Sequence, residues 1–151
     1  PSHTCFLPYT RLLAGGMDYT SGLFDVCNPT KRVATTITRQ IAYYVTIYSG
    51  MQMAADRPRF YEDNFPDLFE FIRNVPVSWE NTLPLMGEIG KYYVVARQAW
   101  NSTDWYIGGV TNEDGRRVVL HFDFLEEGAT YKTKLYLRTE SYKKIAPYLV
   151  L

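Results

Sequence analysis

The stretch TITRQIAYYVTIYSGMQMAAD, residues 36–56, sets the expectation for the first half of the chain. Its apolar residues recur at helical spacing, and so few polar positions remain that a helix buried nearly all round is predicted from Thr36 to Tyr48. Thr35 or Thr36 can cap the start of this helix, and Ser49-Gly50 can end it. The short apolar run over residues 51–56 then predicts a buried strand.

The segments on either side extend this pattern to strand, helix, strand, helix. Residues 5–14 are mostly apolar and stop at two glycines, which predicts another strand buried on both faces, followed by a polar loop over residues 18–32. Pro58 is expected to open a helical turn, and Pro66 a last helix that stops at Asn74. This order is typical of parallel strands joined by helical crossovers.

Two such strands and two helices cannot cover one another, because parallel sheets need several strands with helices on both faces. Residues 1–76 are therefore predicted to be the incomplete end of a (β/α)8 barrel. The alternative is a self-contained α+β domain.

After Pro76 the pattern changes to the alternation that marks half-exposed strands. Strands are predicted over residues 91–100, 105–110, 117–125 and 131–138, with turns at 113–115 and 126–128. Residues 77–151 are therefore predicted to be an antiparallel all-β domain, which makes the fold class mixed.

Composition narrows the classes of partner. Sixteen basic residues balance sixteen acidic ones, so no net field favours nucleic acid or an anionic membrane surface. No apolar run approaches the roughly 20 residues that span a bilayer. The two cysteines, Cys5 and Cys27, have no metal-binding spacing, and whether they pair is left open.

Seven segments carry a resemblance to a known family. The stretch FLPYTRLLAGGMDYTSG, residues 6–22, closely resembles a motif of glycoside hydrolase family 97, the bacterial calcium-dependent α-glucosidases and α-galactosidases. The other similar segments keep the family's order and are residues 39–45, 48–56, 75–80, 87–97, 105–108 and 122–125. The chain departs from the family at Gly16, Ser21 and Gly50, where proline is usual, so a looser loop around Asp18 is expected.

The resemblance implies an N-terminal β-sandwich, a (β/α)8 barrel and a C-terminal antiparallel domain, of which this chain holds only the end. It also implies a bacterial enzyme, periplasmic or otherwise exported, that cleaves α-glucosidic or α-galactosidic bonds of oligosaccharides. The catalytic carboxylates and the calcium ligands are expected upstream, with none of either in this chain, so the fragment alone is expected to be inactive. A self-contained carbohydrate-binding or structural module is the alternative.

Asp18 and Tyr19 are the candidate substrate-binding residues. Asp18 is expected just after a barrel strand, where active sites of such barrels lie, and Tyr19 would stack on a sugar ring. The competing interpretation of Asp18 is a turn aspartate that accepts backbone N–H groups of the following loop. Asp56 reaches the same rim but is expected to cap the next helix, and Arg11 is expected to form a structural ion pair.

The second half offers weaker candidates. His121 and Asp123 lie two residues apart on one strand face and are interpreted as a solvated surface, because one of each is too few to hold a metal. The three tryptophans, Trp79, Trp100 and Trp105, would form a sugar-stacking strip if exposed. Packing in the core or at a domain interface is the favoured interpretation.

Overall fold

The computed structural model describes residues 2–25, 34–137 and 149–150. The chain forms two compact units, residues 1–116 and residues 117–151. The domain boundary expected at residue 76 falls inside the first unit, where it separates helical segments from an antiparallel sheet. That residues 1–76 complete a barrel stays a prediction.

The N-terminal segment is not the buried strand expected over residues 5–14. It forms three 3-10 turns, η1 (Ser2–Cys5), η2 (Leu7–Tyr9) and η3 (Arg11–Ala14). Pro8 suits the start of such a turn, because its φ is fixed near the helical value and it has no N–H to satisfy. Only Cys5 and Leu7 are buried, whereas Leu13 is 77% exposed, so the apolar run does not mark a strand with two covered faces.

A parallel pair of short strands follows. β1 (Tyr19–Ser21) pairs with β2 (Gln52–Ala54), and Tyr19 lies opposite Gln52. The helix α1 (Ile37–Thr46) lies between them in the chain, which confirms a parallel pair with a helical crossover. The first strand, however, lies where a polar loop was predicted, and β2 is largely exposed instead of buried.

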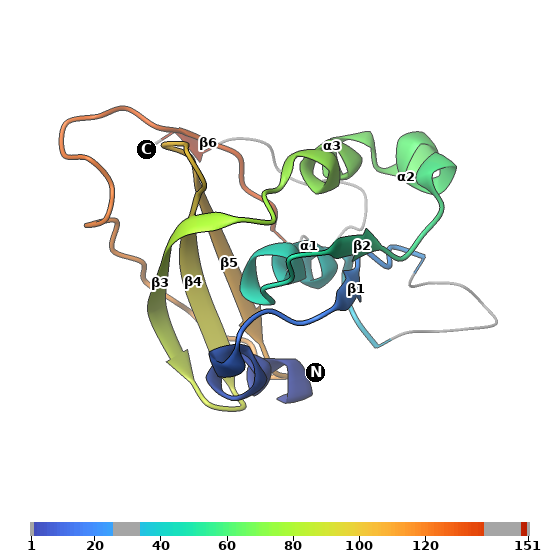
Figure 1. Cartoon of the computed structure of the whole chain (residues 1–151), viewed down its shortest axis with the longest axis horizontal. Helices are drawn as coiled ribbons and strands as arrows, with labels where there is room; N and C mark the ends of the chain where they lie inside the picture. The colour runs from blue at the N-terminus through green and yellow to red at the C-terminus, as the bar shows by residue number, and fades with distance from the viewer. Residues whose placement is uncertain (1, 26–33, 138–148, 151) are drawn as a thin grey trace. The chain divides into compact units, whose positions relative to one another are not determined.

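The helix α1 begins and packs as its sequence predicts. The Oγ1 of Thr36 accepts a hydrogen bond from the backbone N–H of Arg39 at 3.2 Å, as an N-cap should. The buried residues of α1 are Gln40, Ile41, Tyr43, Tyr44, Val45 and Thr46. Figure 1 shows α1 between the antiparallel sheet on one side and the β1–β2 pair on the other. Contacts on both sides explain why so little of this helix is exposed.

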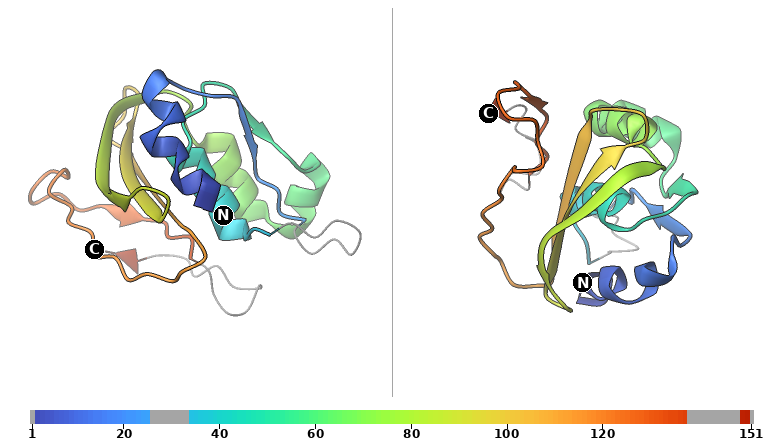
Figure 2. Two further views of the ribbon diagram at one scale, coloured as in Figure 1. Left: turned by 90° about the horizontal axis from the view of Figure 1, so that it is seen from below. Right: turned by 60° about the vertical axis from the view of Figure 1, so that its left-hand side comes forward.

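The first unit contains an antiparallel sheet in the order β3–β4–β5, formed by Trp79–Glu88, Tyr92–Ala99 and Trp105–Thr111. The predictions of β4 and β5 are confirmed. β3 was missed because Pro84 and Gly87 interrupt its alternation, and irregularities shift its register at Trp79/Asn81 and Pro84/Met86. The two views of Figure 2 show how these strands twist beside α1.

The core lies where α1 meets the sheet. Its buried members include Val45 and Ile47 near the end of α1, Val95 on β4 and Val110 on β5. Gly108 on β5 allows the close approach, because a Cβ there would lie 2.8 Å from the Cβ of Val45.

Two further helices, α2 (Pro58–Asn64) and α3 (Pro66–Asn74), begin at the prolines that predicted them. Within the described ranges, no helix has the length and apolarity needed to cross a bilayer.

The second unit contains one described strand pair, β6 (Lys132–Thr133) antiparallel to β7 (Leu149–Val150). The strands expected over residues 117–125 and 131–138 are otherwise wrong. Alternation supplies an apolar face, but an isolated strand pair without a covering layer is only marginally stable in water. Val119 is 60% exposed, in keeping with that lack of cover.

Candidate functional site

The carboxyl ends of β1 and β2 form the candidate functional site, because parallel strands place these ends at the same edge. The loop after β1 holds residues 22–25, and the loop after β2 holds Ala55 and Asp56. A backbone hydrogen bond of 2.9 Å from Ala55 N–H to the Ser21 carbonyl continues the pairing past the strands. The two loops therefore leave the strand pair side by side.

Asp56 binds the loop after β1 through its carboxylate. Its Oδ2 accepts a hydrogen bond from the backbone N–H of Phe24 at 2.6 Å and another from that of Asp25 at 3.1 Å. Hydrogen bonds to a charged acceptor are short and about twice as strong as neutral ones. The expected role of Asp56 as a helix cap is wrong, because Arg57 is the N-cap of α2 and makes no side-chain cap bond.

Tyr61, on α2, also binds both loops. Its hydroxyl donates to the Gly22 carbonyl at 2.6 Å and accepts from the Asp56 backbone N–H at 2.9 Å. The hydroxyl of Tyr44 on α1 donates to the Met53 carbonyl at 3.3 Å. Burial raises the pKa of both phenols above their usual value, so both stay neutral donors at physiological pH.

Gly22 fits between these two hydroxyl groups. Its φ is +82°, and a Cβ would lie 2.7 Å from the Tyr44 hydroxyl and 3.0 Å from that of Tyr61. Gln40 of α1 adds a further contact, since its Oε1 accepts from the Leu23 backbone N–H at 3.3 Å. Three successive backbone N–H groups, those of residues 23–25, are thus bound by side chains from other segments.

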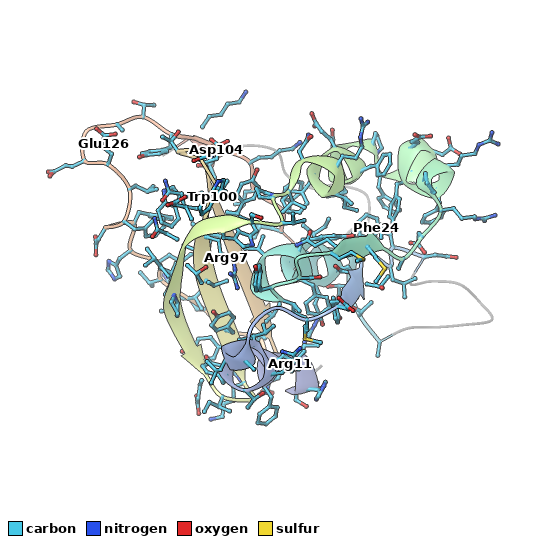
Figure 3. All side chains as sticks on the ribbon, viewed as in Figure 1. Arg11, Phe24, Arg97, Trp100, Asp104 and Glu126 are labelled. Carbon is cyan, nitrogen blue, oxygen red and sulfur yellow. The ribbon has the colours of Figure 1, made fainter. Side chains whose placement is uncertain are left out.

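The ring of Phe24 anchors the same loop in an aromatic cluster. It is 3% exposed, and its centroid lies 5.1 Å from that of Tyr61 and 5.4 Å from that of Phe65, edge-on in both cases. Phe24 is labelled near β2 in Figure 3. The loop is therefore fixed by apolar packing as well as by the Asp56 carboxylate.

Asp18 and Tyr19 lie at the other end of β1. Asp18 is exposed just before the strand begins, not after a strand as expected, and it makes no hydrogen bond with any residue that the structure describes. Tyr19 is half-buried, with its ring edge-on to Tyr43 at 5.5 Å. Burial raises the pKa of Tyr19 to about 12.

Sequence reasoning placed Asp56 at the rim but missed the residues that it binds. The available signal was Tyr44 in the strongly apolar helix α1, because a buried tyrosine hydroxyl needs a polar partner. Tyr61, in the mostly polar helix α2, gave no such signal. From the sequence, Gly22 was expected only to lie in the polar loop over residues 18–32. Its position between the hydroxyls depends on segments that lie far apart in the chain.

The ion pair expected with a carboxylate of the missing barrel stays a prediction for Arg11, which forms no ion pair among the described residues. It is exposed, and its guanidinium donates to the carbonyls of Gly15 at 3.3 Å and Gly16 at 3.2 Å. It thereby satisfies carbonyl groups that the end of η3 leaves open.

Arg97 is the buried cation among the residues that the structure describes in the first unit. It is 7% exposed, and it donates to the Val45 carbonyl at 2.8 Å and to the Thr82 hydroxyl at 2.9 Å. The rings of Tyr48 and Trp79 lie 5.6 and 5.9 Å from its guanidinium carbon. Burial lowers the pKa of Arg97 from its usual value. Its place at the end of α1 matches the negative end of the helix dipole.

The tryptophans and the His121/Asp123 pair, the weaker candidates from the sequence, do not form a binding site in the structure. Trp100 is 59% exposed, whereas Trp79 and Trp105 are partly buried, so the three do not make one exposed strip. His121 and Asp123 are both exposed, as a solvated surface should be, although no strand carries them.

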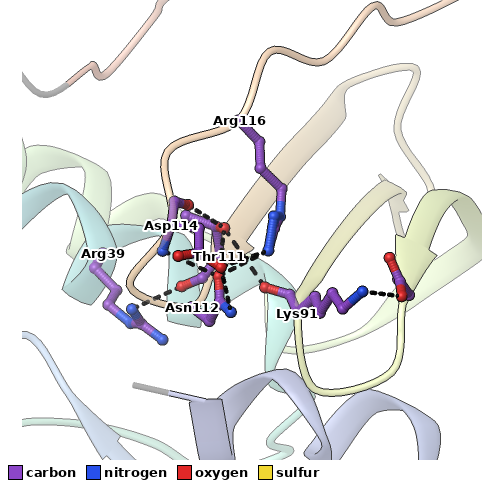
Figure 4. Close-up of polar contacts among 7 residues, drawn as sticks. Arg39, Lys91, Thr111, Asn112, Asp114 and Arg116 are labelled. Atoms are coloured by element: carbon purple, nitrogen blue, oxygen red, sulfur yellow. Dashed lines mark hydrogen bonds and ion pairs between the residues drawn. The ribbon is translucent and has the colours of Figure 1, made fainter.

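The turn after β5 is the richest cluster of polar contacts outside the candidate site (Figure 4). Asn112 Oδ1 accepts from the Asp114 backbone N–H at 3.1 Å and from Arg116 at 2.9 Å. Arg116 also bonds to Asp114 and lies over the ring of Tyr92. These contacts close a turn. Among the described residues, no three histidine, cysteine or acidic side chains come together as metal ligands would.

Comparison with known proteins finds one family across the chain. A family model described as glycosyl-hydrolase 97 C-terminal, oligomerisation, matches residues 78–148. A retaining α-galactosidase of Bacteroides thetaiotaomicron is 30% identical over 135 residues, which are 84% of this chain and 20% of that protein. A probable retaining α-galactosidase of Streptomyces bingchenggensis is 34% identical over 107 residues, or 71% of this chain and 16% of that protein.

Solved structures agree along the whole chain. A glycoside hydrolase family 97 enzyme from Pseudoalteromonas sp. strain K8, in complex with panose, is 37% identical with a TM-score of 0.83. The match covers 100% of this chain and 24% of that enzyme. The same enzyme in complex with acarbose gives a TM-score of 0.84. This chain therefore spans about a sixth to a quarter of the length of its relatives.

Proposed function

This chain belongs to glycoside hydrolase family 97, and from that premise we propose that it is the C-terminal part of a longer bacterial hydrolase. The parent would cleave α-galactosidic or α-glucosidic bonds of oligosaccharides. The observation that carries the proposal is the match of the entire chain to one quarter of a family 97 enzyme at 37% identity. The names of the curated relatives favour α-galactosides and a retaining reaction.

The β1–α1–β2 unit supports the proposed barrel. Parallel strands are almost always covered on both faces and flanked by further strands, because their connecting helices pack on the sheet. Here the pair has two strands, and β2 is largely exposed. Further parallel strands of the parent would give this pair its neighbours.

The catalytic carboxylates are proposed to lie upstream. A retaining glycosidase needs two carboxyl groups about 5 to 5.5 Å apart, one of them a free nucleophile. Of the two carboxylates at the candidate site, those of Asp25 and Asp56, the one of Asp56 already accepts two backbone N–H groups through one oxygen. Such a carboxylate suits a structural anion better than a nucleophile.

Asp18 remains the proposed substrate contact, with Tyr19 beside it. The exposure of Asp18 supports this role, although Asp18 lies at the amino end of β1 and not at the carboxyl end, where substrates of such barrels bind. Because Tyr19 packs on Tyr43, only part of its ring is open to a sugar.

Calcium is proposed to bind the parent through residues outside this chain. The described residues do not fit a calcium site, since that ion prefers six to eight oxygen ligands and no three candidate side chains converge in the described ranges. Export of the parent to the periplasm or beyond is proposed on the resemblance alone, and cell fractionation would test it.

The test compares the 151-residue chain with the full-length parent on aryl α-galactosides and α-glucosides, with and without added calcium. Hydrolysis by the parent and none by the chain is expected, with a moderate loss in parent Asp18→Ala. Turnover by the isolated chain within about a hundredfold of the parent would refute the upstream placement of the carboxylates. A stable monodisperse monomer with no longer native form would favour a self-contained module.

Assembly of parent subunits is a second candidate role, favoured by one surface. Leu83, Ala96 and Ile107 lie side by side in the register of the sheet; the outer two are 37% and 39% exposed, whereas Ala96 between them is buried. The family model that covers this sheet is described by the word oligomerisation. We propose that a second copy of the chain covers this face. Light scattering of Ile107→Lys should then show a smaller particle than the wild type.

A further inference from the structure

We infer that Asp56 is a positioning residue for glycoside hydrolysis, which holds the loop after β1 at the substrate face of the parent barrel. This inference rests on the proposed function. It assigns the work to a residue that touches the loop and not the sugar.

The loop after β1 lies at the end of the strand where barrels bind their substrates. In α/β barrels the substrate lies at the carboxyl ends of the strands, and residues 22–25 leave β1 at that end. Asp56 leaves the neighbouring strand at the same end, two residues after β2 finishes. The geometry of this loop is therefore part of the edge that faces a bound oligosaccharide.

Side chains from other segments fix residues 22–25 in place. The segment of residues 22–25, which includes the left-handed Gly22 at φ +82°, has no regular secondary structure to hold it. The structure instead binds its backbone N–H groups one after another, Leu23 to the amide of Gln40 and the next two to Asp56. Both bonds to Asp56 end on the same oxygen atom, Oδ2. Loss of that one atom frees two consecutive peptide groups.

Asp56 is itself held in place by the hydroxyl group of Tyr61. Its backbone N–H donates to the Tyr61 hydroxyl, which in turn donates to the Gly22 carbonyl. The carboxylate and the hydroxyl thus connect the two loops through side chain and main chain. A displacement of about 1 Å near a reacting group can cost about a hundredfold in rate, so such a connection has a direct effect on turnover.

Two substitutions of Asp56 test the role of its Oδ2 atom, which accepts both N–H groups. Asp56→Asn keeps a carbonyl oxygen that can accept both N–H groups and removes only the charge. Asp56→Ala removes the acceptor altogether. Val95→Ala, in the buried core of β4 and far from the strand ends in sequence, serves as a matched destabilised control.

The experiment has two readouts, kinetics in the full-length parent and amide hydrogen exchange in the 151-residue chain. At a temperature where every variant is folded, Asp56→Ala should lower kcat by roughly tenfold to a hundredfold with little change in KM. Asp56→Asn should recover most of that loss, and Val95→Ala should leave kcat unchanged. Exchange at the amides of Phe24 and Asp25 should quicken in Asp56→Ala and stay slow in Val95→Ala.

The outcomes separate the two proposals. A wild-type parent without glycosidase activity would refute the proposed function, whatever the exchange data show. An active parent in which Asp56→Ala keeps its kcat would overturn the positioning role. Equal losses of kcat in Asp56→Ala and Val95→Ala would also overturn it, because a general loss of stability would then explain both.

Discussion

Replacement of Gly22 by alanine should destabilise the first unit. Gly22 has φ +82°, and an added Cβ would meet the hydroxyls of Tyr44 at 2.7 Å and Tyr61 at 3.0 Å. Contacts below about 3 Å force the neighbours to move. The hydroxyl groups would then leave their acceptors, the carbonyls of Met53 and Gly22.

The magnitude follows from three contributions. A left-handed conformation costs an L-residue about 1–2 kcal/mol, and each lost hydrogen bond about 0.5–1.5 kcal/mol. Alanine restricts the unfolded chain and returns about 0.4–1 kcal/mol. The net loss for Gly22→Ala is about 3 kcal/mol. At roughly 2–4 °C per kcal/mol for a chain of this size, Tm should fall by about 10 °C.

The assay is thermal unfolding followed by circular dichroism, with two control variants in the same unit. Gly15 has φ +115° but open space around it, so Gly15→Ala measures backbone strain without the clash. Gly50→Ala meets neither obstacle and measures the effect on the unfolded chain. If Gly22→Ala lowers Tm no more than Gly15→Ala does, the reasoning from the tyrosine hydroxyls is refuted.

Three further predictions concern the same unit. Arg97→Met should lower the free energy of unfolding by about 2 kcal/mol in urea titration, because the Val45 carbonyl at the end of α1 loses its donor; an unchanged midpoint would contradict this. Thr36→Ala should cost about 1 kcal/mol by loss of the N-cap of α1, whereas Thr36→Ser should cost little. Alkaline stability should fall because burial raises the folded-state pKa of Tyr19 to about 12 from an unfolded value near 10. The stability contributed by that neutral phenol is complete below pH 10 and is lost as pH rises through 12, so Tyr19→Phe should flatten the decline in urea titrations at pH 9 to 12.

Much of the first unit could be predicted because its signals are local. Thr36 caps α1, Pro58 and Pro66 open α2 and α3, and alternation marks β4 and β5. Each of these features depends on residues within a few positions, where capping, proline geometry and side-chain periodicity act. The family resemblance, carried by short motifs, was equally available from the sequence and is confirmed.

Tertiary structure decided what depended on distant partners. The apolar run over residues 5–14 satisfied the composition of a buried strand, but no neighbouring strand pairs with it, and Pro8 favours 3-10 turns instead. Pro84 interrupts the alternation of apolar and polar residues in β3, so the sequence pattern did not predict this strand. In the structure β4 pairs with β3 along nearly its whole length. The composition of an apolar run does not determine which segment pairs with it. Its secondary structure therefore depends on what packs against it in the fold.

The candidate site shows the same limit most clearly. Asp56 and Pro58 look locally like the start of a helix, and that pattern predicted a cap. The carboxylate instead binds the N–H groups of Phe24 and Asp25, which lie 32 and 31 residues earlier in the chain. The sequence by itself determined that an acidic residue follows β2. Only the parallel pairing of β1 with β2 brought these N–H groups within reach of it, because a buried donor needs an acceptor wherever the fold supplies one.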